Sequence, residues 1–223
     1  METPVVSVII PVYNGERFID DALKSVFRQD YRPLDVIVVD DGSVDKTADI
    51  ISQFGEVRYL SQPHQGLAAA LNKGLGAARG EFITFLDSDD WWTPHTLRKQ
   101  IDHMSANPQA DLVLGKMHNY MEPGCSVTVS TKNLQAGEFV CLIMGAVMVR
   151  RHVFDTIGLF NRTLTLAIDV DFFIRIKEAG FRMDIVQDVF LYRRIHGSNM
   201  SLQSDNKDFF RVIKAAIERK RKQ

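Results

Sequence analysis

Three apolar runs rich in valine and isoleucine or phenylalanine each stop at a cluster of polar residues, and helix-like segments separate them. The runs are "VVSVIIPVYN" (5–14), "LDVIVVDDGS" (34–43) and "EFITFLDSDD" (81–90). Runs of this kind predict strands buried on both faces of a sheet. Helices are expected at 16–28, 45–54 and 66–79, and a short strand at 57–60. The alternation predicts parallel βαβ units, and therefore an α/β fold with a mainly parallel central sheet flanked by helices.

The polar residues after these runs share one position in the predicted fold. They are Asn14, Asp40, Asp41, Asp87 and Asp89. In open α/β sheets, ligands bind outside the carboxyl ends of the strands, near the point where the strand order reverses. The sequence therefore predicts a polar site along one edge of the sheet.

Beyond residue 90 the pattern becomes less regular. In "TPHTLRKQIDHM" (93–104), Thr93 as N-cap and Pro94 as the first helical residue predict a helix. Short β-like segments follow at "DLVLG" (111–115), "SVTVS" (126–130) and "EFVCLIMGAVMV" (138–149). A last internal helix is expected from about Asp169 to Gly180, with the glycine just after its end.

Composition excludes several classes of protein. The chain has 223 residues, 27 Lys plus Arg against 28 Asp plus Glu, and a net charge of −1, so it is not expected to bind nucleic acid. Cys125 and Cys141 match neither a CxxC motif nor a zinc spacing, which favours a reducing, cytoplasmic location. The N-terminal residues lack signal-peptide features, and the longest apolar run (139–149) is shorter than the roughly 18 residues that span a bilayer.

The segment 205–223 is basic, with seven Lys or Arg and three acids. Its apolar residues, Phe209, Phe210, Val212, Ile213, Ala216 and Ile217, lie at helical spacing. One interpretation is a basic amphipathic helix that contacts an anionic membrane surface. The alternative is a C-terminal helix that docks on the domain and ends in a frayed tail.

Two carboxylates at i and i+2, Asp87 and Asp89, can converge on one hard cation such as Mg²⁺ or Mn²⁺. Such a cation would bind a diphosphate as its other ligand. A phosphatase of the haloacid dehalogenase type is the alternative, with Asp87 as nucleophile and Asp89 as general acid. Against it, two strand-end sites precede this one and "DWW" follows, whereas the DxD strand of those enzymes opens the domain.

Four segments together resemble the family 2 glycosyltransferases of the nucleotide-sugar-dependent GT-A fold. They are "SVIIPVYNGERFIDDALKSVFRQDY", "DVIVVDDGSVDKT", "GLAAALNKGLGAARGEFITFLDSDD" and "DVDFFIRIKEAGF". The resemblance implies an inverting transferase that moves a sugar from a nucleotide diphosphate donor, often UDP-linked, to an acceptor hydroxyl. It further implies a single domain over 1–223, with a donor half (1–115), an acceptor half (116–204) and the basic C-terminal segment (205–223).

The same resemblance implies a cytoplasmic enzyme, at most peripheral to the membrane, that builds a cell-surface polysaccharide or a glycolipid. Its partners would be the nucleotide-sugar donor and a saccharide or lipid-linked acceptor.

The resemblance also implies roles for residues of the donor half. Pro11, Val12 and Tyr13 would line the nucleobase, and Asp41 would accept a hydrogen bond from it. Gly66 and Asn72 lie where relatives contact the nucleotide, although this glycine- and alanine-rich helix could instead simply pack tightly. Arg79 could reach phosphate or interact with the carbonyls at the end of its helix.

The DxD of the family matches Asp87, Ser88 and Asp89. Asp89 is the better candidate for the metal, and Asp87 for the metal, its bound water or the ribose. Trp91 and Trp92 could form a platform for the sugar ring, or one of them could be packing. His196, with Arg193 or Arg194, could close over the diphosphate, or the histidine could be structural.

Inversion requires a base opposite the leaving group, to take the proton of the acceptor hydroxyl. The resemblance assigns this role to Asp169, with Asp171 as a lesser candidate; both could instead be acids favoured at a helix N-terminus. Ile168 stands where the family has Glu, which leaves the acceptor class open. This difference also motivates an alternative function, a catalytically silent module that binds nucleotide sugars.

Overall fold

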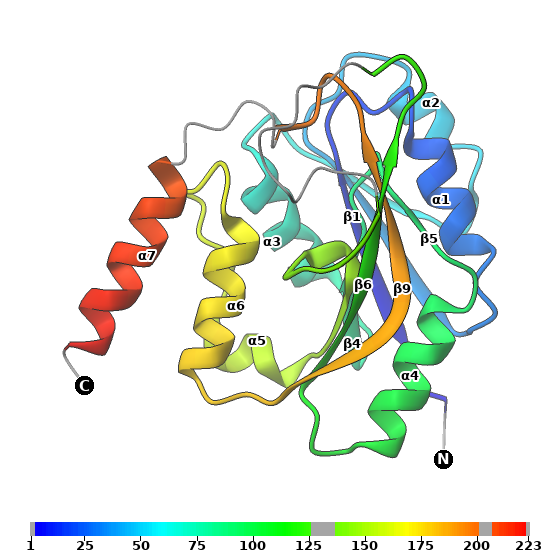
Figure 1. Cartoon of the computed structure of the whole chain (residues 1–223). Helices are drawn as coiled ribbons and strands as arrows, with labels where there is room; N and C mark the ends of the chain where they lie inside the picture. Colours follow the sequence, from blue (N-terminus) through cyan, green and yellow to red (C-terminus); the bar gives the residue numbers. More distant parts are fainter. Residues whose placement is uncertain (1–2, 126–136, 201–206, 222–223) are drawn as a thin grey trace.

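The computed structural model describes residues 3–125, 137–200 and 207–221, and the strand expected at 126–130 lies outside them. One sheet runs through the molecule in the order β3-β2-β1-β4-β8-β6-β9-β5, with β7 beside β6. Figure 1 shows helices on both faces of this sheet, with α1 and α4 on one face and α3, α5 and α6 on the other. The expected α/β architecture is confirmed.

The first four strands of the sheet order are mutually parallel, as the alternation predicts. They are β1 (Val6–Val12), β2 (Leu34–Asp40), β3 (Arg58–Ser61) and β4 (Phe82–Phe85). The connecting helices are α1 (Ile19–Phe27), α2 (Thr47–Ile51) and α3 (Leu67–Ala77). β1 is buried along its whole length, because helices cover both faces of the sheet there.

Close contact between α3 and the sheet depends on a glycine. A Cβ built on Gly74 would lie 2.5 Å from Cγ2 of Ile9 on β1 and 3.3 Å from Cγ2 of Val39 on β2. Only a residue without a side chain lets the helix approach this near. The Gly/Ala composition of 66–79 therefore has a packing role.

The second half of the sheet contains antiparallel pairs. β8 (Val147–Arg150) pairs antiparallel with β4 and with β6 (Leu112–Met121), and β9 (Met183–Ile195) is parallel to β6. Two short strands complete the sheet: β5 (Trp91–Trp92) on β9 and β7 (Gly137–Val140) on β6.

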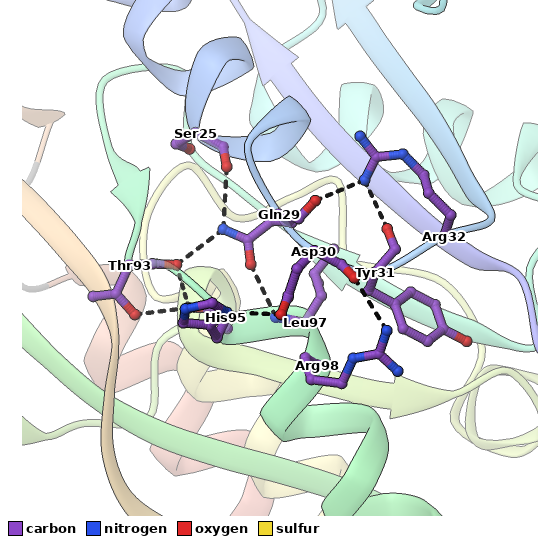
Figure 2. A network of polar contacts seen from close by, with 10 residues as sticks. Ser25, Gln29, Asp30, Tyr31, Arg32, Thr93, His95, Leu97 and Arg98 are labelled. Atoms are coloured by element: carbon purple, nitrogen blue, oxygen red, sulfur yellow. Dashed lines mark hydrogen bonds and ion pairs between the residues drawn. The ribbon is translucent and has the colours of Figure 1, made fainter.

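The helix after the acidic loop begins later than predicted. α4 spans Thr96–Ala106, so the assignment of Thr93 as N-cap and Pro94 as first helical residue is wrong. The Thr93 hydroxyl instead donates to the carbonyl of Val189 on β9, at 2.7 Å. Oε1 of Gln29, at the end of α1, accepts the hydrogen bond from the Leu97 N–H, at 3.1 Å (Figure 2). A side chain far away in the sequence thus accepts the hydrogen bond of a backbone N–H in the first turn of α4. Local sequence patterns do not predict such a partner.

The remaining helices are α5 (His152–Ile157), α6 (Ile168–Glu178) and α7 (Lys207–Lys220), with a single 3₁₀ turn at Met144–Ala146. Gly180 has φ +78° just after α6, as predicted for a glycine that ends a helix. α7 lies outside α6, on the side away from the sheet (Figure 1). In the parts of the chain that the structure describes, no helix is both long and apolar enough to cross a membrane.

Candidate functional site

The predicted edge is formed by the carboxyl ends of adjacent parallel strands. β1, β2 and β4 end at Val12, Asp40 and Phe85, and the acidic loop 87–90 follows directly after β4. The Asp41 N–H donates to the carbonyl of Val12 at 2.8 Å, and the Leu86 N–H donates to the carbonyl of Ile9 at 3.1 Å. These bonds extend the sheet pairing to the loops, so the strand-end residues lie along one edge.

The acidic loop concentrates charge in a poorly solvated place. Burial, together with the nearby carboxylates of Asp89 and Asp169, raises the pKa of Asp87 to about 7. Burial and the carboxylates of Asp89 and Asp87 also raise the pKa of Asp90, which is almost fully enclosed and accepts a hydrogen bond from the Arg194 N–H at 2.8 Å. Ionising all the acids of this loop would therefore build up more negative charge than its surroundings compensate.

One arginine opposes this charge. The guanidinium of Arg193 lowers the pKa of Asp87, Asp90 and Asp169, which places it within electrostatic reach of all three. Its neighbour Arg194 is directed elsewhere, with Nη2 at 2.7 Å from the Asp21 carboxylate on α1. Successive side chains of a strand point to opposite faces, and the Arg194 side chain contacts the loop only at its backbone, where Nε donates to the Asp89 carbonyl at 3.1 Å.

His196 holds the metal-candidate acid of the loop. Its ring is buried, and Nδ1 accepts a hydrogen bond from the Ser198 N–H at 3.2 Å. Nε2 therefore carries the proton and donates to Oδ2 of Asp89, at 3.0 Å. Nδ2 of Asn199 donates to the same oxygen at 3.2 Å. Oδ1 of Asp89 accepts no hydrogen bond among the described residues.

Asp169 lies at the start of α6, and its carboxylate accepts a hydrogen bond of 3.4 Å from the Met144 N–H. Burial raises its pKa to about 6, against the lowering effects of this N–H and of Arg193. Asp171, the lesser candidate, is buried and pairs with Arg175 at 2.8 Å, as expected of a structural acid. Ile168 is buried in the core, so the residue that replaces the family's Glu packs against apolar neighbours.

At the other end of the edge, Tyr13 is half exposed and its ring stacks on His64, with centroids 4.1 Å apart. The Asp41 carboxylate is held by the 62–66 loop. Oδ1 accepts from Gln62 and from the Gln65 N–H, and Oδ2 from the Gly66 N–H, all at 2.7–2.9 Å. Nδ1 of His64 lies 2.9 Å from Oδ2 and hydrogen-bonds the backbone carbonyl of Asp41 at 3.2 Å.

Two other predicted donor-site residues have structural partners. Nδ2 of Asn72 donates to the Phe160 carbonyl at 2.9 Å, and Oδ1 of Asn72 accepts from the Phe160 N–H at 2.8 Å. These bonds connect α3 to the loop before α6. The Arg79 N–H bonds to Ser7 and Asp35, near the starts of β1 and β2. Arg79 therefore lies at the opposite edge from the acids, away from the predicted phosphate, and the carbonyl of Ala77 at the helix end accepts from Arg58 at 3.1 Å.

The two tryptophans also lie in different environments. Trp92 is buried, and its indole N–H donates to the carbonyl of Gly145 at 2.8 Å, so this tryptophan is packing. Trp91 is partly exposed and lies beside Tyr192.

Sequence reasoning missed His64 and Gln62, which hold the loop beside Tyr13. The signal that could have found them is "SQPHQG" (61–66), a Pro- and Gly-containing segment directly after β3, on the same edge as the acids.

Among residues 3–125, 137–200 and 207–221, no group of three or more His, Cys, Asp or Glu side chains is arranged to hold a metal ion. A site for Mg²⁺ or Mn²⁺ does not require such a group, because these ions are commonly held by one or two carboxylates together with waters and substrate phosphates. Asp87 and Asp89 meet this smaller requirement, because they supply two nearby carboxylates whose negative charge the surrounding residues do not offset.

The sheet, with its strand-end acids at the edge where parallel strands give way to antiparallel ones, defines the GT-A class of nucleotide-sugar-dependent folds. A family model described as Glycosyl transferase family 2 matches residues 7–190. The chain therefore belongs to glycosyltransferase family 2. The match supports the glycosyltransferase interpretation over the phosphatase alternative.

Curated relatives agree with this family. The chain is 41% identical over 118 residues to the putative glycosyltransferase EpsH of Bacillus subtilis (strain 168), an alignment that covers 51% of this chain and 34% of the relative. It is 30% identical over 210 residues to the uncharacterized glycosyltransferase RT0329 of Rickettsia typhi (strain ATCC VR-144 / Wilmington), covering 87% and 65%. The chain thus spans between 34% and 65% of the length of these two relatives.

Solved structures confirm the fold. S. aureus TarS 1-349 in complex with UDP-GlcNAc superposes with a TM-score of 0.77 at 24% identity, covering 95% of this chain and 65% of that one. Mannosyltransferase PcManGT from Pyrobaculum calidifontis, in complex with GDP-Man and Mn²⁺, gives a TM-score of 0.74 at 22% identity, covering 98% and 65%.

Proposed function

We propose that this chain is an inverting glycosyltransferase that moves a sugar from a nucleotide diphosphate donor, a UDP-sugar, to an acceptor hydroxyl. One observation carries the proposal. The carboxylate of Asp169 on α6 raises the pKa of Asp87 in the loop after β4. The proposed base therefore lies in the same site as the acids that are proposed to bind the donor and its metal. The solved structures that bind nucleotide sugars support the donor class, and the acceptor is proposed to be a saccharide or lipid-linked precursor of a surface polysaccharide or glycolipid.

The nucleobase is proposed to lie along Pro11, Val12 and Tyr13, where the half-exposed ring of Tyr13 offers a stacking face. Stacking of a base on an aromatic ring contributes about 1–3 kcal/mol. For Asp41 to accept a hydrogen bond from the base, the base N–H displaces either the Gln62 donor from Oδ1 or the His64 ring from beside Oδ2. The Gly66 N–H, at the start of α3, remains bound to Asp41.

Asp89 and Asp87 would hold a divalent cation, with Ser88 between them at the donor. The fit rests on the structure, because the loop has more negative charge than Arg193 offsets and Oδ1 of Asp89 is open for a ligand. When bound, the cation would supply positive charge against the departing diphosphate. Arg193 adds a second positive charge at the same place, and His196 fixes the orientation of Asp89.

Asp169 is proposed to take the proton of the acceptor hydroxyl. With a pKa of about 6, its carboxylate is mostly deprotonated at neutral pH, yet remains more basic than an exposed aspartate. A base works best when its pKa lies near the operating pH. Because Ile168 replaces the Glu of the family's Glu-Asp pair, Asp169 is the one acid of that pair that remains. An acceptor therefore has fewer polar contacts here.

Thermal denaturation with and without Mn²⁺ tests the donor site. A UDP-sugar at about 100 times its dissociation constant adds about 2.7 kcal/mol to the unfolding free energy, which raises the Tm by about 5–10 °C for a domain of this size. The shift should require the metal and should be lost in Asp89→Asn. Absence of a metal-dependent shift with both UDP- and GDP-sugars would contradict the proposal. A shift without any transfer or hydrolysis of the donor would instead support the silent binding module.

We also propose that α7 brings the enzyme to an anionic membrane surface. Val212 packs toward the domain, and Arg219 pairs with Glu178 of α6 at 2.8 Å. Phe209, Phe210, Ile213 and Ile217 are exposed on the rest of the helix, among basic residues. An apolar face with flanking Lys and Arg is the pattern of helices that lie in a membrane interface.

A further inference from the structure

A groove of about 640 Å³ opens on the other side of the acidic loop, between α1 and the strands β5, β9 and β6. We call it the aromatic groove. None of the residues to which the proposed function gives a contact with nucleotide, metal or acceptor proton lines it. Its volume lies within the range of roughly 300–1,000 Å³ that is typical of small-ligand sites. Its lining includes three basic residues and one acid, Lys24, Arg28, Arg194 and Asp21, together with the aromatic residues Trp91, Tyr120 and Tyr192.

One wall of the groove is a row of aromatic side chains. Trp91 on β5 lies opposite Tyr192 on β9, and their rings are nearly parallel with centroids 5.5 Å apart. The ring of Tyr120 on β6 meets Trp91 edge-on at 5.3 Å. Arg194 covers one face of Trp91, with its guanidinium 4.7 Å from the ring centroid. The most accessible ring is therefore Tyr120, which is 39% exposed.

The floor of the groove is fixed by a buried glutamine. Nε2 of Gln29 donates to the carbonyls of Ser25 and Thr93 at 3.1 and 2.9 Å, while its Oε1 accepts from the Leu97 N–H (Figure 2). These bonds join the end of α1 to the start of α4. The groove therefore exists before any ligand arrives, and a ligand does not have to order it.

The charges of the groove favour an anion. Lys24 pairs with Asp20, and Arg194 with Asp21. Arg28 is exposed and forms no ion pair within residues 3–125, 137–200 and 207–221. Because the whole chain has a net charge of −1, this positive charge is local to the groove.

We propose that the aromatic groove binds an anionic saccharide, one with carboxylate or phosphate substituents. Tyr120 and Tyr192 would pack against the apolar faces of sugar rings and use their hydroxyls as polar contacts, and Arg28 would pair with the acidic group. Nucleic acid fits less well, because its affinity depends on many basic contacts to phosphates. The inference rests on the proposed function only in taking the saccharide to be part of the acceptor.

The aromatic groove lies next to the acidic loop of the proposed reaction site. Nε of Arg194, whose side chain lines the groove, donates to the carbonyl of Asp89 at 3.1 Å, and its backbone N–H donates to Asp90. A saccharide in the groove therefore lies directly behind the acidic loop. There it would hold a longer acceptor chain near the enzyme between transfers.

Isothermal titration calorimetry, without nucleotide or metal, tests the proposal. The probes are a tetrasaccharide of alternating glucuronic acid and N-acetylglucosamine, a mannose tetrasaccharide with 6-phosphate groups, neutral tetra-N-acetylchitotetraose and a thymidine tetranucleotide. At least one anionic saccharide should bind about 10-fold more tightly than both the neutral probe and the nucleotide.

Two variants locate the binding. Tyr120→Ala should weaken the favoured saccharide by at least 5-fold, since burying a large apolar side chain contributes about 1.5–3 kcal/mol. Arg28→Gln, at an exposed position where folding is not at risk, should weaken it by a similar factor and reduce its salt dependence. Matched controls outside the groove are Phe210→Ala and Lys177→Gln, both at exposed positions, which should leave the affinity unchanged.

Failure of both anionic saccharides to bind, or unchanged affinity in both groove variants, would overturn the inference. Tighter binding of the nucleotide would overturn it as well. The result is separable from the proposed function. Saccharide binding in a protein that transfers no sugar would contradict the transferase proposal alone, whereas transfer without any saccharide binding in the groove would contradict this inference alone.

Discussion

At the residue scale, the site is organised by carboxylates whose environments differ. Asp171 and Asp41 are held by protein partners, whereas Asp87 and Asp169 have raised pKa values in places where little positive charge offsets them. Perturbed carboxyls of this kind concentrate at functional sites. The difference lies in burial and partners, which the residue type alone does not reveal.

Replacing Asp169 by Asn should lower the transfer rate by about 10²–10⁴-fold, the usual contribution of a general base. Asn keeps an oxygen that can accept the Met144 N–H, so the fold and donor affinity should persist. Steady-state kinetics together with calorimetric titration of the donor measure the two effects. The control is Asp102→Asn, at an exposed position on α4. Wild-type turnover in the Asp169 variant would rule out this base.

The pH profile of the wild-type enzyme provides the accompanying test. Because burial raises the pKa of Asp169 to about 6, the carboxylate needed to accept a proton disappears as the pH falls through 6. The value of kcat at saturating metal should therefore rise with pH below about 6 and level off above it. The residual rate of the Asp169 variant should lack this step. A flat profile from pH 5 to 8 in the wild type would argue against Asp169.

At the scale of single elements, α3 shows how sequence composition and packing are related. The glycines and alanines of 66–79 leave two interpretations open, nucleotide contact or close packing. The structure shows close packing at Gly74, where the helix rests on Ile9 and Val39. Asn72 serves the same purpose by bonding the Phe160 backbone.

Two alanine substitutions in α3 separate these effects. Gly74→Ala places a methyl group 2.5 Å from the Ile9 side chain, and overpacking of this kind destabilises a core by about 1–3 kcal/mol. Gly76→Ala, in the same helix, meets no atom within 4 Å and should stabilise the protein by up to about 1 kcal/mol through helix propensity. Urea denaturation measures both. Equal effects of the two changes would contradict the close-packing interpretation.

At the scale of the whole molecule, the surface that α7 presents determines how the protein meets a membrane. Phe210 is 69% exposed. The wild type should cosediment with vesicles that contain anionic phosphatidylserine, and not with neutral phosphatidylcholine vesicles. Phe210→Ser should weaken this binding about 10-fold, because burying a large apolar side chain contributes about 1.5–3 kcal/mol.

A matched control for this experiment is Val44→Ser, an apolar residue that is 89% exposed in the loop before α2. It should bind vesicles as the wild type does. Equal loss in both variants would show that α7 has no special role in membrane contact.

The sequence by itself determined the strands and helices of the parallel half, the strand-end position of Asp41, Asp87 and Asp89, and the helix that begins near Asp169. These features follow from local periodicity and from the topology of βαβ units, which places the carboxyl ends of adjacent strands together. Burial of Trp92 was one of two interpretations that the sequence left open.

Only the tertiary structure decided the rest. The start of α4 depends on Gln29, the orientation of Asp89 on His196, and the engagement of Asp41 on the 62–66 loop. The aromatic groove joins residues from α1, β5, β6 and β9 that lie far apart in the sequence. Hydrogen bonds, burial and pKa values arise from neighbours in space, and local sequence patterns do not specify which distant side chains those neighbours are.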